Sequence, residues 1–183
     1  MGETDAYTGT NANVAIGYEC GLFVGVEAIN NVLIGYECAK AATGAGEFTG
    51  NNNTYIGYQC GLLNIGGSEN VGIGTNCLDS NTTGNQNVAI GKECLHSNTV
   101  SNNTAIGYQC GYYNQNGENN VAIGYQCLKG DSDAYITTNS NVAIGYQCGL
   151  FVGNAATNNV LIGFECAKAA GSGEFVGGEN VII

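Results

Sequence analysis

Hydrophobic and polar positions alternate in short stretches that return along the whole chain. In the first, N-V-A-I-G, Val14 and Ile16 point to one side of an extended backbone, Ala15 points to the other, and Gly17 ends the run. A period of two closed by a turn residue predicts a strand of four or five residues. A helix would need apolar residues three and four positions apart, and these windows, rich in Gly and Asn, do not supply them.

The stretch belongs to an eight-residue motif, N-[VT]-x-I-G-x-x-C, that occurs in nine complete copies. A tenth copy begins at Asn180 and reaches Ile183. Successive copies start 16 to 22 residues apart, and all of this variation lies in the spacer between each Cys and the next Asn. Self-similarity at such a period is typical of solenoids and other repeat arrays.

A strand this short cannot bury its apolar face alone. Identical motifs stack best when they lie parallel and in register, each turn of the chain covering the one before it. The sequence therefore predicts an all-β protein, a parallel β-solenoid of about ten rungs with one motif in each. We expect residues 1–12 to be a lead-in or cap and residues 13–183 to be a single array that ends in its tenth rung. Ten rungs about 4.8 Å apart form a rod on the order of 50 Å long.

Stacking turns each motif position into a column along the rod. The motif begins with Asn, whose side-chain amides can hydrogen-bond between rungs and whose backbone accepts turn conformations. We expect a structural Asn column made of Asn13, Asn31, Asn53, Asn70, Asn87, Asn103, Asn120, Asn141, Asn159 and Asn180. The Gly that follows Ile, from Gly17 to Gly163, is expected at a corner where a side chain would clash or φ must be positive.

The last motif position holds every cysteine of the chain. These are Cys20, Cys38, Cys60, Cys77, Cys94, Cys110, Cys127, Cys148 and Cys166. A thiol is small and only weakly polar, so the column can serve as packing at an inward corner. Disulfides between rungs are a second interpretation, although Cβ atoms about 4.8 Å apart exceed the usual separation and nine thiols leave one over. A metal-bearing or electron-carrying column is the third, but no CxxC pair or nearby His supplies a second ligand at the usual spacing.

Aromatic rings occupy the position after Gly in most copies. Six are tyrosines, namely Tyr18, Tyr36, Tyr58, Tyr108, Tyr125 and Tyr146, and Phe164 keeps the ring. Thr75 and Lys92 interrupt the column at neighbouring rungs. We expect a stack of rings that covers one flank of the rod, with a contact face for a partner as the alternative.

Composition removes several functional classes. The chain has fifteen acidic residues against four basic ones, for a net charge of −11, and no basic cluster. This argues against binding nucleic acid or an anionic membrane surface. No stretch reaches the roughly 20 apolar residues of a membrane span, and the first ten residues lack the features of a signal peptide. We identify no catalytic, cofactor-binding or metal-binding set; His96 stands alone in a spacer and is expected on the solvated surface, and the pair Asp131 and Asp133 is weak evidence for calcium.

The motif resembles the N-x-V-A-I-G-x-x-S repeat of the YadA-like heads of trimeric autotransporter adhesins, and the NTAIGYQA-type repeats of phage and viral tail fibres. The similarity extends from Asn13 to Ile183, and NTAIGYQCG at Asn103–Gly111 is one of its clearest copies. It implies a parallel β-roll, usually a homotrimer, in a stalk or head that projects from a cell or virion and contacts host glycans or proteins. The spacers of 8 to 14 residues and the uniform Cys depart from both relatives.

A longer duplication lies above the motif. NVAIGYECGLFVG at Asn13–Gly25 returns as NVAIGYQCGLFVG at Asn141–Gly153, a shift of 128 residues or seven rungs. Copying of this kind suits a fibre lengthened by duplication and offers little to an enzyme. We therefore expect a non-enzymatic, extracellular or virion-surface fibre segment that self-associates as a trimer or filament, with the long spacers Ala39–Asn52 and Leu128–Ser140 as recognition loops. The alternatives are an ice- or polysaccharide-binding solenoid that uses a regular Tyr or Asn/Thr face, and a redox or metal-bearing filament.

Overall fold

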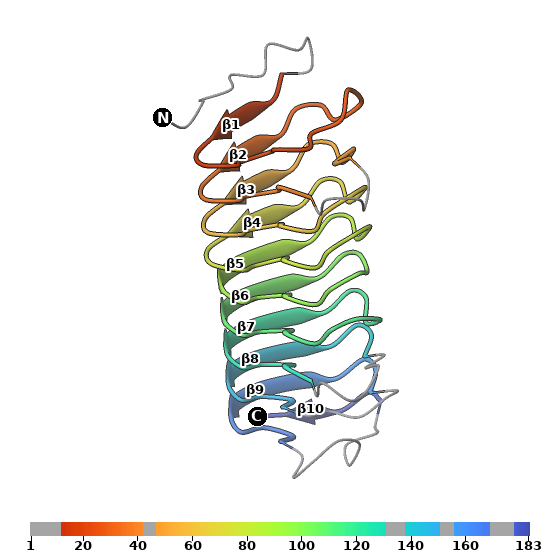
Figure 1. The fold of residues 1–183 in the computed structure, drawn as a ribbon. Helices are drawn as coiled ribbons and strands as arrows, with labels where there is room; N and C mark the ends of the chain where they lie inside the picture. The colour runs from red at the N-terminus through yellow and green to blue at the C-terminus, as the bar shows by residue number, and fades with distance from the viewer. Residues whose placement is uncertain (1–11, 42–46, 131–137, 151–155, 169–177) are drawn as a thin grey trace.

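The protein is a parallel β-solenoid, as its repeats predict. The computed structural model describes residues 12–41, 47–130, 138–150, 156–168 and 178–183, and within these ranges the chain forms no helix. Ten parallel strands form one sheet whose spatial order follows the sequence (Figure 1). The strands are β1 (Val14–Ile16), β2 (Val32–Ile34), β3 (Thr54–Ile56), β4 (Val71–Ile73), β5 (Val88–Lys92), β6 (Thr104–Tyr108), β7 (Val121–Tyr125), β8 (Val142–Tyr146), β9 (Val160–Phe164) and β10 (Val181–Ile182).

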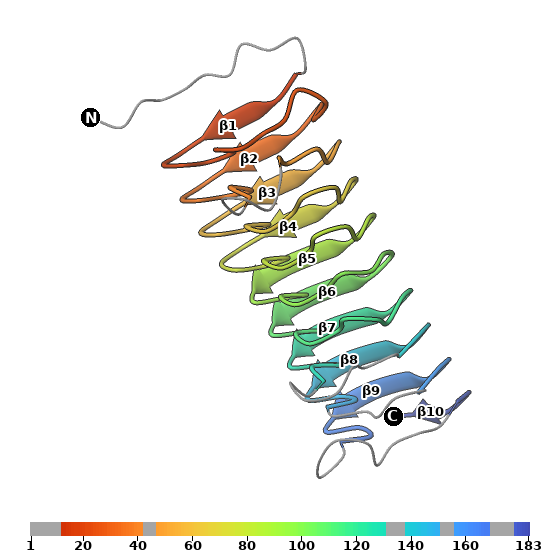
Figure 2. The ribbon, with the colours of Figure 1, turned by 45° about the vertical axis from the view of Figure 1, so that its right-hand side comes forward.

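Like residues stack on like along the entire sheet. Ile16 pairs with Ile34, which pairs with Ile56, and the same register continues through every neighbouring pair of strands that follows. The spacers vary in length without disturbing this register, because extra residues leave the coil between the sheet and the next Asn. Figure 2 shows the resulting regular succession of rungs. The predicted in-register stacking is confirmed.

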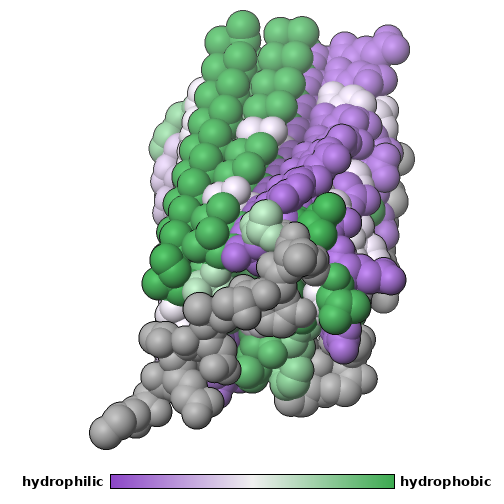
Figure 3. All heavy atoms as spheres, turned by 90° about the horizontal axis from the view of Figure 1, so that it is seen from above, coloured by the Kyte–Doolittle hydropathy of each residue, from purple (hydrophilic) through white to green (hydrophobic). Residues whose placement is uncertain are grey.

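The structure decides which side of the strands faces the core. The central motif residue points inward, as at Leu33, Tyr55 and Ala89, which are all fully buried. The flanking Val and Ile point outward, and Ile16 is 58% exposed in the first strand. Two hydrophobic columns therefore run side by side on the outer surface of the sheet, one of them interrupted by paler residues (Figure 3). These outward Val, Thr and Ile side chains of β1–β10 are referred to below as the outer face.

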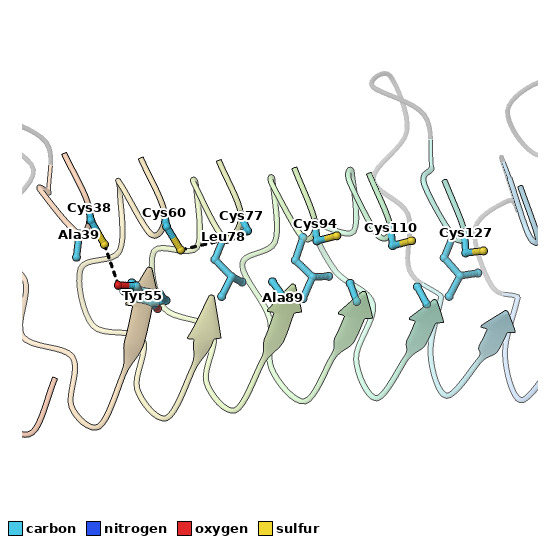
Figure 4. Packing of buried hydrophobic residues seen from close by; sticks show 14 of the residues in the cluster. Cys38, Ala39, Tyr55, Cys60, Cys77, Leu78, Ala89, Cys94, Cys110 and Cys127 are labelled. Carbon is cyan, nitrogen blue, oxygen red and sulfur yellow. Dashed lines mark hydrogen bonds between the residues drawn. The ribbon is translucent and has the colours of Figure 1, made fainter. Parts of the chain in front are cut away.

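The interior is filled by the central motif residue, the Cys and the residue after the Cys (Figure 4). Large and small residues compensate each other inside this narrow core. Tyr55 lies against Gly61, where an added Cβ would approach the tyrosine ring to 2.8 Å. In the next rung Gly72 replaces the large residue and Leu78 supplies the volume, fully buried. Close packing of this kind leaves no room for a substrate-sized interior cavity in these rungs.

Each rung turns its corners with left-handed backbone. In the rung that begins at Asn103, the residue before the motif (Asn102, φ 63°), the residue before the Cys (Gln109, φ 51°) and the residue after it (Gly111, φ 60°) all have positive φ. The Gly after Ile is more constrained. At Gly124 φ is 126°, and a Cβ would lie 1.9 Å from the carbonyl oxygen of Gly145 in the next rung. The predicted need for Gly at this corner is confirmed on both grounds.

Candidate functional site

The most regular polar feature is the Asn column, which lies inside the rod. At Asn70 the backbone N–H and Nδ2 both donate to Oδ1 of Asn53, at 2.9 and 3.1 Å. Nδ2 also donates to the carbonyl oxygen of Gly84 at 2.9 Å, and Oδ1 accepts the backbone N–H of Asn87 at 2.9 Å. All but the terminal members are at most 4% exposed. The predicted hydrogen-bonded column is confirmed, and since its side chains are buried they offer no contact face for a partner.

A second set of buried asparagines was not predicted from the sequence. It consists of Asn64, Asn81, Asn98 and Asn114, each four residues after a Cys. In three of these turns Oδ1 accepts the backbone N–H of a Gly three residues on, as at Asn64 and Gly67 (2.8 Å), while Nδ2 donates to the carbonyl oxygen of the same Gly. The sequence signal is N-x-x-G in the 17-residue rungs. This turn shapes the far corner of the coil.

The cysteines form a column of free thiols along the core. Seven of the nine are buried, and only Cys20 and Cys166 at the two ends are partly exposed. Cys60 and Cys77 bring their Sγ atoms to 3.0 Å, whereas the Cys38 thiol donates to the carbonyl oxygen of Tyr55 at 3.2 Å. The column occupies the inward corner that the packing interpretation expected. The disulfide and metal interpretations concern states that this geometry of free thiols does not test.

The ionisation of the thiols is governed by burial and by their neighbours. Burial raises the pKa of Cys60 well above that of an ordinary thiol, and also raises the pKa of Cys148. Cys20 and Cys38 are coupled: the hydrogen bond between them raises the pKa of Cys20 and lowers that of Cys38. Neutral thiols therefore dominate most of the column, and a thiolate is best tolerated where a neighbouring S–H points at it.

The Tyr column lies on the surface as two stacks. Ring centroids of Tyr18, Tyr36 and Tyr58 are 5.2 Å apart with nearly parallel planes. The second stack runs from Tyr108 to Phe164 at 5.0 to 5.2 Å, and Lys92 caps it with Nζ 5.9 Å from the Tyr108 centroid. The predicted stacking and its interruption are confirmed. Because the ring faces cover one another, only ring edges are presented along the flank.

A polar column beside the tyrosines was also missed. The residue before each Cys is Glu, Gln or Asn, and its side chain bonds to the equivalent one in the next rung. Gln109 donates to Glu93 at 2.6 Å and Gln126 donates to Gln109 at 2.8 Å. Lys40 donates to Glu37 at 2.9 Å and forms an ion pair with Glu19, which lowers the pKa of both carboxyls. These contacts accompany a left-handed backbone at every member of the column.

His96 differs from the expectation of a solvated surface residue. Its ring stacks on Tyr112 with centroids 4.6 Å apart, and Nε2 lies 3.7 Å from Oδ2 of Asp79. The side chain is only 22% exposed, because the spacers stack as regularly as the strands do. Burial raises the pKa of Asp79, while a protonated His96 would lower it. The pair is a packed structural contact on the spacer side.

Other sequence candidates are not brought together. Asp131 and Asp133 lie outside the described residues, as do parts of the two long spacers and residues 1–11 of the lead-in. Within the described ranges, no three His, Cys, Asp or Glu side chains are grouped so as to hold one metal ion. Among the same residues, no helix is long and hydrophobic enough to span a membrane.

The outer face is the largest feature without a partner in the single chain. Its side chains range from half-buried to well exposed, including Val14 (45%), Ile73 (38%) and Val181 (69%). They stand in two straight columns on a continuous hydrogen-bonded sheet, so their positions are set by the backbone. Comparison with protein-family models, curated proteins and solved structures finds no significant match to this chain.

Proposed function

We propose that this chain is a rigid, non-enzymatic segment of a surface or virion fibre, which self-associates through its outer face, as a homotrimer, and holds a binding tip away from the surface that carries it. The outer face is the observation that carries the proposal. Ten strands present Val or Thr and Ile outward in unbroken columns. An apolar surface that runs the length of a rod fits a partner with the same period and length, and another copy of the chain has both.

The size of this surface favours burial. Ten strands about 4.8 Å apart, with outward residues two positions apart, give an apolar strip on the order of several hundred Å². Contiguous patches on monomeric proteins seldom exceed that range, and larger ones mark interaction sites. The thin interior adds a second reason. The core is about one side chain deep and built largely of Ala, Cys and Leu, so association would add hydrophobic burial that the single coil lacks.

The test is the oligomeric state of charged variants. Ile90→Lys and Ile123→Lys place ammonium groups on the outer face, and the matched control, Thr83→Lys with Asn116→Lys, adds the same charge on exposed spacers. Light scattering on the eluting peak should give three copies of the 18.8 kDa chain for the wild type and the control. The outer-face variant should be monomeric with an unchanged far-ultraviolet spectrum. A monomeric wild type at high concentration would end the trimer proposal.

The same proteins address the rival function. A flat, regular face could contact ice, and thermal hysteresis shown by a monomeric wild type and lost in the outer-face variant would favour that alternative. Polysaccharide binding through the Tyr column is less well supported, because sugar rings stack on aromatic faces and these faces are covered by neighbouring rings. Pull-down on insoluble polysaccharide with Tyr125→Ala and Tyr146→Ala would measure that contribution directly.

A further inference from the structure

The cysteine column is the feature that the proposed fibre function leaves unexplained. Packing at this corner requires a small side chain, which Ala or Ser would also provide, yet every complete motif ends in Cys. The thiol is the strongest soft-metal ligand among the side chains that could fit there. Its regular use along the entire core points to a property of sulfur itself.

The C-terminal half of the column has one repeated geometry. From Cys94 to Cys148, each Sγ lies 3.2 to 3.4 Å, or at Cys110 3.5 Å, from the carbonyl oxygen of the Ile in its own rung. Each Sγ also lies 2.8 to 3.2 Å from the carbonyl oxygen of the Gly in the next rung. Equal contacts in successive rungs mean that the sulfurs stand in a straight file with the spacing of the rungs, as Figure 4 shows for Cys94, Cys110 and Cys127.

That spacing matches a particular coordination chemistry. Metal–thiolate bonds are about 2.3 Å long, so an ion in line between two sulfurs holds them about 4.6 Å apart. Stacked strands hold equivalent atoms about 4.8 Å apart. The described residues provide no group of three or more ligands for one ion, which excludes a tetrahedral zinc site of the usual kind there. Two-coordinate, linear geometry is typical of monovalent soft ions such as Cu(I) and Ag(I).

Charge balance also favours monovalent ions. When a thiol binds such an ion its proton leaves to solvent, RSH + M⁺ → RS–M + H⁺, and the sulfur keeps a lone pair to bind the next ion along the file. The chain of alternating sulfur and metal therefore remains close to neutral, so no large charge is buried in the apolar core. We propose that the thiol column binds monovalent soft metal ions, of the Cu(I) and Ag(I) class, with one ion between each pair of successive sulfurs.

Silver titration tests the proposal on the whole chain. Reduced protein, freed of reductant, is mixed with Ag(I) either folded or during refolding from urea, and bound ions are counted by native mass spectrometry. Nine thiols leave eight intervals, so uptake should saturate at up to eight ions, with about one proton released per ion and the β-sheet spectrum retained. X-ray absorption should report two sulfur neighbours per silver. Failure to take up silver, sites with three or more sulfurs, or loss of the sheet on binding would each overturn the proposal.

Two variants with equal thiol counts separate a column from independent thiols. The alternating variant changes Cys38, Cys77, Cys110 and Cys148 to Ser. The end-trimmed variant changes Cys20, Cys38, Cys148 and Cys166 to Ser. Each keeps five thiols, but the alternating variant has no adjacent pair and the end-trimmed variant has four. We expect no two-coordinate silver in the first and about four ions in the second; equal uptake would refute the column.

Single substitutions serve if four changes prevent folding. Cys110→Ser removes two intervals and Cys166→Ser removes one, so their capacities should fall to about six and seven ions from eight. Serine retains a donor for the carbonyl oxygens that the thiols contact, which limits the structural effect. The outcome is independent of the proposed fibre function, because the outer face and the thiol column lie on opposite sides of the strands and the trimer mass is measured without metal.

Discussion

At the scale of single residues, the fold depends on positions where no other side chain has the required backbone and space. The Gly column is the clearest case. Gly124 combines φ of 126° with direct contact to the carbonyl of the next Gly, so strain and overlap act together. The neighbouring left-handed positions are occupied by Glu, Gln, Asn and Leu, which meet only the conformational cost. The rung can therefore vary at those corners and not at the Gly.

Substituting Ala for Gly124 should destabilise the protein by about 3 kcal/mol or more, since a Cβ 1.9 Å from a backbone oxygen forces two rungs apart. Chemical denaturation followed by circular dichroism measures the change in the free energy of unfolding. Gly66→Ala is the matched control. Its added Cβ would have only Thr49 Oγ1 nearby, at 3.9 Å, and its φ is compatible with Ala. A similar loss in both variants would contradict the proposed cause.

The Asn column gives a second prediction at this scale. Asn70→Ala removes the acceptor for the Asn87 N–H and the donor for the Gly84 carbonyl, both inside the rod. Leaving two buried polar groups unpaired should cost about 2 to 4 kcal/mol in unfolding free energy. Asn116→Ala, on an exposed spacer position, should change stability by less than about 0.5 kcal/mol. Hydrogen exchange at the Asn87 amide should accelerate only in the first variant.

At the scale of strands and turns, the sequence predicts some features much better than others. Strand position and register followed from the motif, because identical residues stack favourably only when aligned. The inward side did not follow, since Ala15 and its neighbours Val14 and Ile16 are all apolar and alternation alone does not rank two apolar faces. The core turned out to be the small-residue side, as the narrow coil has no room for two branched side chains per strand.

The spacers were less predictable for a related reason. Their buried groups, such as Asn64 and the pair of Asp79 with His96, act through contacts with the spacer of the next rung. These contacts exist only once the coil has closed, so they leave a weak trace in a single spacer. The Asn and Cys columns were recoverable because each recurs in every motif.

Compensation between rungs leads to a prediction that opposes the pattern of the repeats. Ala or Leu fills the central motif position in most copies, so Gly72→Ala would be expected to stabilise β4. Instead an added Cβ would lie 2.8 Å from the Tyr55 ring and 2.7 Å from Sγ of Cys60. We expect Gly72→Ala to destabilise the wild type by about 1 to 3 kcal/mol.

Removing the ring should reverse this effect. In a Tyr55→Ala background the same Cβ partly fills the cavity left by the ring, so Gly72→Ala should become neutral or stabilising. The cycle of four proteins, followed by denaturant unfolding, should give a coupling energy above about 1 kcal/mol. Additive effects would show that the two rungs do not share one packing volume.

At the scale of the whole molecule, the rod is a one-dimensional array. Each rung contacts its two neighbours through the strands, the Asn column and the Cys column, and the 128-residue duplication shows that blocks of seven rungs can be repeated within one chain. Stability in such arrays is close to a sum of rung and interface terms. Length should therefore matter less than the closure of each turn.

Deletion of a whole rung tests this directly. Removing residues 87–102 joins Gln86 to Asn103, which restores the motif spacing, so β4 can pair with β6 as it now pairs with β5. The shortened protein should unfold cooperatively, with modestly lower stability, and small-angle scattering should show a rod about 5 Å shorter. Removing only residues 79–86 deletes half as much but leaves Leu78 directly before Asn87, so one turn cannot close. That smaller deletion should be the more damaging, with loss of sheet signal and aggregation, because the rungs on either side can no longer lie in register; a rod that tolerates it as well as the larger one would not depend on closed turns at all.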